Sequence, residues 1–324
     1  MKLTIKKFLF SFLVLAAVVC SACKSTKGPA GEGKEQAFRN SLTKIDGALL
    51  WKIEGPAKDG SASTVYLLGT YHAGDDRMTG FPECVRSALD SSDRFCCELS
   101  KTDWENFSQL VTDRTMQSVL TDFSHTFIDD LTQEEILLIS SIIDQQTLAQ
   151  LVCFEPWVLN NTLQSVLIMA SGLDTTKAYD IMIMDELNTK NADFEGLDEA
   201  QTQLDLMAYG DWDTQLIMLR DTLKDIMNLA DSAKEMSDLY EIFLTGDDKA
   251  FEQAYYKDLD KEIKDEPVYA QYIKELLLDR NEKWAVKIQD YIDMGGTTFV
   301  FAGSAHFTGP DSVFECMYRN GTLQ

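Results

Sequence analysis

Basic residues are scarce in this sequence. Its 324 residues include 29 lysines and arginines against 53 aspartates and glutamates, which gives a formal net charge of −24 at pH 7. A surface of this sign repels the phosphates of nucleic acids and anionic lipid headgroups, and it attracts cations. We therefore expect no nucleic-acid partner. The same charge favours solubility, and it leaves the oligomeric state open.

Cysteines are few, and their spacing is not that of a metal site. Seven are present, and after the N-terminal region there is neither a Cys-x-x-Cys pair nor a zinc-ribbon spacing. We therefore expect no thiolate metal site. Cys96 and Cys97 lie in an apolar run, which predicts that they are buried as small apolar side chains.

Long apolar runs are missing except at the N-terminus, and no later segment has the roughly 18 apolar residues of a transmembrane helix. Residues 1–22 combine lysines, an apolar stretch and small residues before Cys23, as in a bacterial lipoprotein signal peptide. We expect Cys23 to become the lipidated first residue, anchored to a membrane of the cell envelope on its periplasmic side or surface. The alternative is an ordinary secretory signal that is cut nearby.

The remaining chain predicts a tether followed by one domain. Residues 23–40 are polar and lack apolar periodicity, which indicates a flexible tether. Residues 41–324 are long enough for a single large domain. Strand-like runs at both of its ends enclose a long helical middle, so we predict an α/β fold with a mixed central sheet and large helical insertions. The expected strands are 48–53, 64–68, 94–99, 193–196 and 297–302, and the expected helical regions are 81–90, 103–184 and 199–293.

Histidines are also few, and two of the three share one local pattern. An apolar strand runs into Gly69-Thr70-Tyr71-His72, and another runs into Gly303-Ser304-Ala305-His306. Glycine lets the backbone turn or approach a neighbour closely at a strand end. Ligands usually bind at the carboxyl ends of strands in open α/β sheets, so both imidazoles are expected at one site, in the strand-end loops. The third, His125, has no such setting and is predicted to lie on the surface.

Glu98 is the carboxylate expected to join them. It ends a third apolar run, 94–98, where a glutamate needs a metal ion, an arginine or hydrogen bonds as its partner. His72, His306 and Glu98 together would leave open positions on a divalent ion, and they do not distinguish Mn, Co and Zn. The alternative is that both histidines are structural.

The pattern resembles the TraB/GumN family, which includes the Tiki metalloproteases and is related to a wider erythromycin esterase/ChaN-like superfamily. The resemblance covers the chain from about residue 49 to 314. Two positions depart from the family: Asp198 stands where members often have glutamate, and Ser312 stands where a glycine is common. The matching positions are the two motifs with Gly69, His72, Gly303 and His306, then Glu98, 172–174, 194–198 with Asp198, Gln203, and the helix with Arg280, Asn281 and Trp284.

The resemblance implies a metal-dependent hydrolase, with a peptide or protein as the suspected substrate. His72, His306 and Glu98 would hold the ion, and Glu98 or Asp198 would act as general base. Arg280 would hold a substrate carboxylate or stabilise an oxyanion, unless it forms an ordinary surface ion pair. The alternative function is non-catalytic binding of haem, a metal or a protein partner, because the wider superfamily includes a haem-binding lipoprotein and some members are linked to signalling or export.

Overall fold

The structure is a computed structural model that describes residues 42–257, 263–264 and 266–321. The predicted signal peptide 1–22, the lipidated Cys23 and the tether 23–40 lie outside the described residues. Among the residues that are described, no helix combines the length and apolar character needed to cross a membrane.

A mixed sheet of six strands confirms the predicted α/β fold. The strand order is β1-β2-β3-β6-β4-β5, so β6, the last of the described strands in sequence, lies between β3 and β4. The pairs β1–β2 and β2–β3 are antiparallel, whereas β3–β6, β6–β4 and β4–β5 are parallel. The strands are β1 Leu42–Ile45, β2 Leu50–Pro56, β3 Ala62–Thr70, β4 Arg94–Cys97, β5 Glu195–Gly196 and β6 Gly296–Gly303.

The helical middle of the chain is also confirmed, and its breaks fall where glycine allows them. Gly210 lies between two helices with a φ of 76°, and Gly246 ends a helix with a φ of 71°. The helices are α2 Glu83–Asp90, α3 Lys101–Gln117, α4 Phe127–Asp130, α5 Gln133–Ile142, α6 Gln145–Leu151, α7 Pro156–Ala170, η4 Thr175–Lys177, α8 Tyr179–Thr189, α9 Ala200–Met207, α10 Trp212–Met227, α11 Leu229–Thr245, α12 Asp248–Tyr255, α14 Val268–Ile273, the π-helical turn η5 Lys274–Leu278, α15 Asp279–Met294, η6 Ser304–Phe307 and α16 Val313–Arg319.

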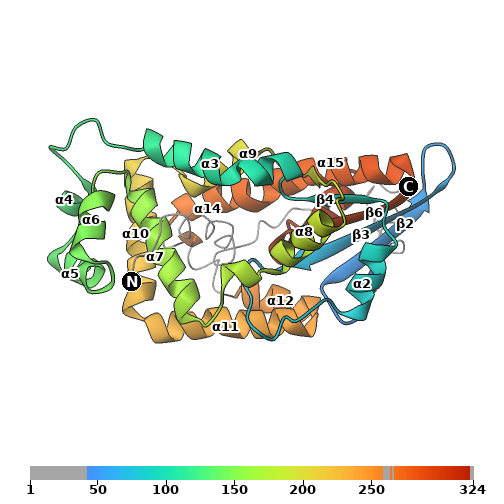
Figure 1. The fold of residues 1–324 in the computed structure, drawn as a ribbon, viewed down its shortest axis with the longest axis horizontal. Helices are drawn as coiled ribbons and strands as arrows, with labels where there is room; N and C mark the ends of the chain where they lie inside the picture. Colours follow the sequence, from blue (N-terminus) through green and yellow to red (C-terminus); the bar gives the residue numbers. More distant parts are fainter. Residues whose placement is uncertain (1–41, 258–262, 265, 322–324) are drawn as a thin grey trace.

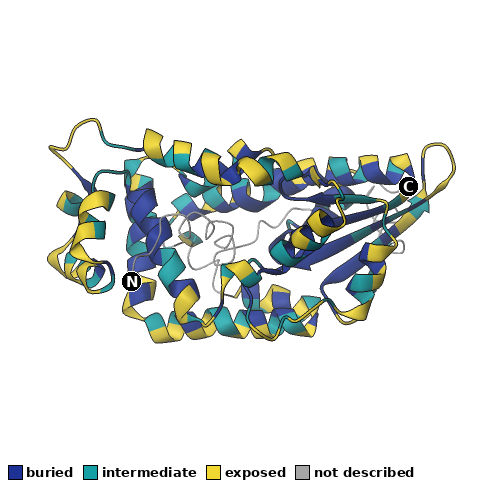
Figure 2. Ribbon diagram, in the orientation of Figure 1, coloured by how far each residue is buried: buried dark blue, intermediate teal, exposed yellow. Residues whose placement is uncertain are grey.

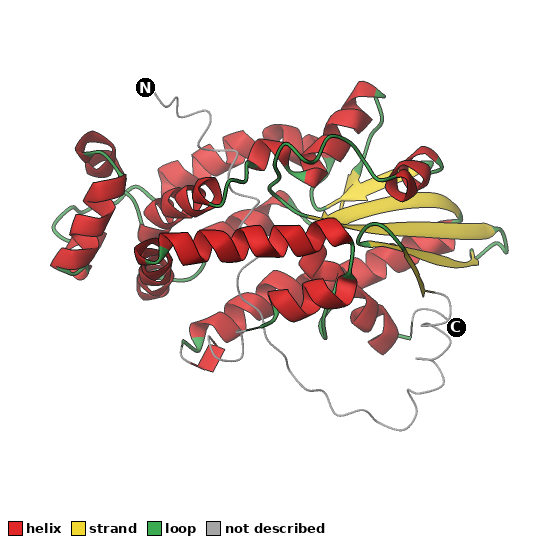
Figure 3. Ribbon diagram, turned by 90° about the horizontal axis from the view of Figure 1, so that it is seen from below, coloured by secondary structure: helices red, strands yellow, loops and turns green. Residues whose placement is uncertain are grey.

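The molecule is elongated, with the sheet at one end and α4, α5 and α6 at the other (Figure 1). A view from below shows the strands gathered at one end of a largely helical molecule (Figure 3). The strands are mostly buried, whereas the helices expose one side (Figure 2). A large core surrounds the sheet, and a separate apolar cluster joins α4, α5, α7 and α10 at the far end. The prediction of a single domain for residues 41–324 stays a prediction.

Candidate functional site

Three parallel strands bring the predicted site residues to one edge of the sheet. Thr70, which ends β3, is paired in register with Gly303, which ends β6. Glu98 directly follows the last residue of β4. Strand β4 is paired with β6 on the side of β6 that faces away from β3. His72 and His306 come shortly after β3 and β6, so all three side chains lie where the carboxyl ends of these strands meet. This edge faces the helical part of the molecule (Figure 1).

Glu98 is buried, and both of its carboxylate oxygens accept hydrogen bonds. Its Oε2 accepts hydrogen bonds from Arg280 Nη2 at 2.6 Å and from Gln203 Nε2 at 3.2 Å. Its Oε1 accepts the backbone N–H of Gly303 at 2.9 Å. Burial alone would raise the pKa of this carboxyl, but the positive charges of Arg280 and His72 outweigh it and lower the pKa to about 2. The prediction that Glu98 requires a partner is confirmed, and Arg280 is that partner.

Arg280 is buried inside the site. Only 3% of the residue is exposed, so it does not form the surface ion pair that was the alternative. Its Nε lies 2.8 Å and its Nη2 2.7 Å from Asp198 Oδ2. Its Nη1 donates to the backbone oxygen of Leu276 at 3.1 Å, within the π-helical turn η5. Turns of this kind are frequent at functional sites. The guanidinium also lies 4.7 Å from the ring centroid of Trp284, so its orientation is fixed on several sides.

Asp198 supports Arg280 and lies within the predicted site. Its Oδ2 faces the guanidinium, and its Oδ1 accepts a hydrogen bond from Trp284 Nε1 at 2.7 Å. Its backbone N–H donates to the backbone oxygen of Glu98 at 2.8 Å, so the segment directly after β4 places both Glu98 and Asp198. The catalytic roles of Asp198, Glu98 and Arg280 stay predictions.

His72 lies between two carboxylates. Its Nδ1 is 2.9 Å from Asp180 Oδ2, and its Nε2 is 3.5 Å from Glu98 Oε1. Burial alone would lower the pKa of His72, but the charge and hydrogen bond of Asp180, together with the charge of Glu98, raise it to about 9. Asp180 was missed by sequence reasoning, because it belongs to α8 and no local pattern links it to a histidine 108 residues away.

His306 lies in a different environment and is neutral. Its Nδ1 is 2.7 Å from Asn281 Oδ1, and its Nε2 is 3.1 Å from Arg280 Nη1. Because a guanidinium can only donate, Nε2 accepts, and the ring hydrogen is on Nδ1. Burial and the charge of Arg280 keep the pKa of His306 well below its usual value. The Trp284 ring lies against the imidazole, with 4.1 Å between the ring centroids.

The glycines of the two motifs let the motifs interlock. A Cβ added to Gly303 would lie 2.8 Å from His72 Nε2, so the second motif makes room for the histidine of the first. A Cβ added to Gly69 would lie 2.8 Å from Ser304 Oγ, which donates to the backbone oxygen of Thr70. Each glycine therefore permits the close approach that brings both histidines to Glu98 and Arg280.

The fit to a divalent ion is partial. His72 Nε2 and Glu98 Oε1 have the separation expected of two ligands on one ion, about 3 to 3.5 Å. Asp180 binds the other nitrogen of His72, as carboxylates commonly do behind a metal-bound histidine. The described residues contain no group of three His, Cys, Asp or Glu side chains arranged to hold an ion. His306 Nε2 faces Arg280, so the predicted metal ligands stay a prediction.

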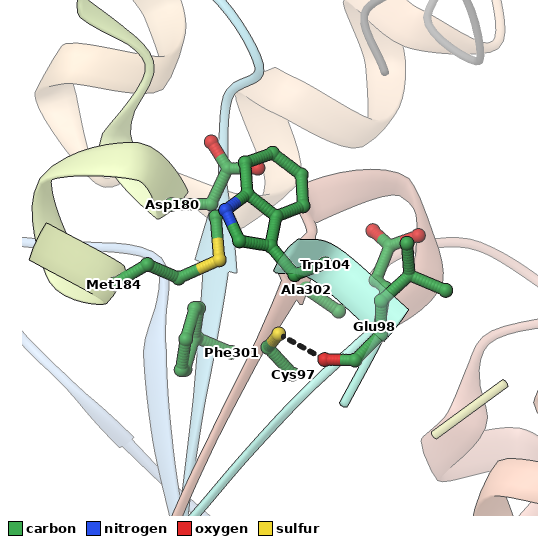
Figure 4. Close-up of a pocket in the computed structure, with 8 residues that line it drawn as sticks. Cys97, Glu98, Trp104, Asp180, Met184, Phe301 and Ala302 are labelled. Carbon is green, nitrogen blue, oxygen red and sulfur yellow. Dashed lines mark hydrogen bonds between the residues drawn. The ribbon is translucent and has the colours of Figure 1, made fainter. Parts of the chain in front are cut away.

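A small cavity lies beside the site. Figure 4 shows it with Asp180, Met184 and Trp104 on one side and Cys97 and Phe301 near its floor. Its volume of about 20 Å³ is room for roughly one water molecule. Glu98 and Asp180 both line this cavity.

The predictions that His125 lies on the surface and that Cys96 and Cys97 are buried are confirmed. The side chain of His125 is 58% exposed and forms an ion pair with Asp130. Cys96 and Cys97 are buried, and burial raises the pKa of both thiols, that of Cys96 to about 12. All five cysteines of the described part of the chain are free. The absence of a thiolate metal site stays a prediction.

Replacing Gly303 tests the interlocking of the motifs. We expect Gly303→Ala to destabilise the protein by about 1–3 kcal/mol, because the new methyl group overlaps His72 in a closely packed site. Gly55→Ala, in β2, is the matched control, since no atom lies within 4 Å of its added Cβ. Urea unfolding of the two variants measures the difference. Equal unfolding free energies would show that the His72 ring moves aside at no cost.

The raised pKa of His72 predicts a loss of stability at alkaline pH. The contribution of protonated His72 is complete below the unfolded-state pKa of about 6.5 and is lost as the pH rises through the folded-state value of about 9. The shift corresponds to roughly 3 kcal/mol. We expect the difference in unfolding free energy between metal-free wild type and His72→Gln to shrink between about pH 6 and about pH 9.5. A difference that stays constant over this range would contradict the assigned charge.

Comparison with known proteins identifies the family of this chain. The family model described as the TraB/PrgY/gumN family matches residues 49–322. The chain is 28% identical over 282 residues to an uncharacterized protein of Treponema pallidum (strain Nichols), an alignment that covers 85% of this chain and 82% of the relative. No solved structure matches the chain significantly. The family match includes the strand-end motifs and the helix with Arg280, and the chain therefore belongs to the TraB/PrgY/gumN family.

Proposed function

We propose that this protein is a hydrolase, with a peptide bond as the expected substrate. The observation that carries the proposal is the meeting of His72, Glu98, Arg280 and His306, which come from three strand ends and one helix. Such a set offers a charged imidazole, a neutral imidazole, a carboxylate and a fixed guanidinium at one place. The resemblance to the Tiki metalloproteases supports a peptidase within this class.

We propose that a divalent ion, Mn, Co or Zn, works with these residues. Glu98 Oε1 would hold it together with His72 Nε2, which would give up its hydrogen to bind the ion, and His306 would join them once Arg280 Nη1 leaves its Nε2. When bound, the ion would lower the pKa of a water molecule and polarise the scissile carbonyl. The negative charge around His72 supports this, because the carboxylates of Asp180 and Glu98 lie next to its two ring nitrogens.

The protein's own residues would prepare the site for developing negative charge. Arg280 is held by Asp198 through Nε and Nη2 and by Glu98 through Nη2, so its charge stays in the site when Nη1 leaves His306. Asn281 accepts the Nδ1 hydrogen of His306 and leaves the other nitrogen as an acceptor. The buried setting strengthens these interactions relative to water.

The second candidate is non-catalytic binding of a protein partner, in line with other roles in the wider superfamily. The ion pair between Glu98 and Arg280 supports it, because each charge already has its partner within the protein.

Metal analysis separates these candidates. We expect the purified chain to bind about one divalent ion, and the double variant His72→Ala/His306→Ala to bind none while it stays folded. His125→Ala is the control, since this third histidine lies on the surface. A screen against a peptide library with and without a chelator then tests hydrolysis. A wild type that binds no Mn, Co or Zn would contradict the metal-dependent mechanism and favour partner binding.

We also propose that a lipid on Cys23 holds the protein to a membrane of the bacterial cell envelope. The sequence before Cys23 supports this. We expect Cys23→Ser to move the protein from the membrane fraction to the soluble fraction, because the acylated residue is lost. Cys20→Ser, three residues earlier, is the matched control. Equal fractionation of the two variants would contradict lipidation at Cys23.

A further inference from the structure

The start of α8 is tied by backbone hydrogen bonds to the loop that follows β3. Gly74 N donates to Asp174 O at 3.0 Å, and Asp174 N donates to Gly74 O at 2.8 Å. Tyr179 N, in the first turn of α8, donates to Tyr71 O at 3.1 Å. Tyr71 directly precedes His72. The first turn of α8 therefore has a fixed position relative to the His72 ring.

Asp180 is the side chain that this arrangement brings to His72. It is 7% exposed, and its Oδ2 lies 2.9 Å from His72 Nδ1. Its Oδ1 has no hydrogen-bond partner among the described residues. A buried carboxylate is costly unless it is paired. The contact with His72 thus compensates the burial of Asp180.

We propose that Asp180 is a positioning residue of this site, which holds His72 through Nδ1 so that Nε2 faces Glu98. The geometry stands on its own, while the consequence for metal binding rests on the proposed function. A carboxylate behind a metal-bound histidine fixes the ring orientation and increases its strength as a ligand. His306 has an amide, Asn281, in the corresponding place, so the two histidines of the paired motifs are supported by different groups.

The chemistry of a carboxylate explains why we expect asparagine to support His72 less well than Asp180 does. An ionised carboxylate only accepts hydrogen bonds, so it keeps the hydrogen on His72 Nδ1, and Nε2 is then the nitrogen that loses its hydrogen when an ion binds. An amide can donate instead. With the Glu98 carboxylate opposite Nε2, an amide that donates to Nδ1 would favour the hydrogen on Nε2, where it blocks the ligand lone pair.

The first test measures binding of Zn²⁺ and Mn²⁺ to the full chain in detergent. We expect Asp180→Asn to weaken binding about 10–100-fold, as loss of such a supporting group commonly does. Asp185→Asn is the matched control, because this residue lies on the same helix, is exposed and should leave affinity unchanged. Thermal unfolding of both variants separates a local effect from misfolding. Unchanged affinity in a folded Asp180→Asn variant would overturn the proposal.

The second test measures the wild-type protein, so it does not depend on whether a variant at Asp180 folds. Only three histidines are present, so ¹⁵N-histidine labelling gives few signals, and His125→Ala helps to assign them. In the metal-free protein we expect His72 Nδ1 to carry a hydrogen with a downfield resonance, as in a bond to a carboxylate. A His72 Nδ1 without hydrogen would overturn the proposal even if metal binds. If wild type binds no metal but shows this signal, the positioning role stands and the metal-dependent function fails.

Discussion

Arg280 and Glu98 form a buried ion pair in which the guanidinium Nη2 lies 2.6 Å from the carboxylate Oε2, and the other site residues are arranged around it. The pair joins α15 to the end of β4, which are far apart in the sequence. Burying either charge alone would be strongly destabilising. Asp198, on a second side of Arg280, and the Gly303 N–H, on Glu98, supply the remaining interactions that such a pair requires. The strand ends and the helix are therefore held in one arrangement.

The paired motifs look alike in sequence but are chemically unequal. His72 lies between the carboxylates of Asp180 and Glu98, which raise its pKa, whereas burial and the charge of Arg280 lower that of His306. At neutral pH one site therefore holds a charged imidazole and a neutral one. Divergent environments of neighbouring titratable groups are a common property of acid–base sites.

The helical middle of the chain is part of the site rather than an accessory to it. It supplies Asp180 from α8, Asp198 from the segment after β5, and Arg280 from α15. The distant end of this region has its own apolar cluster between α4, α5, α7 and α10. Because the site includes groups from both the sheet and the helices, movement between these parts would change the distances around Glu98.

The sequence by itself determined the elements whose signals are local. Five strands and the helical regions follow from apolar patterns, and the Gly-x-x-His motifs and Glu98 follow from their places at the ends of these strands. Arg280 and Asp198 came from the family resemblance. The short strand β1 was missed, because its four residues are stabilised by pairing with β2. The strand order and the pairing of Asp180 with His72 were decided by tertiary structure, since hydrogen bonds between distant residues leave no periodic pattern in the sequence.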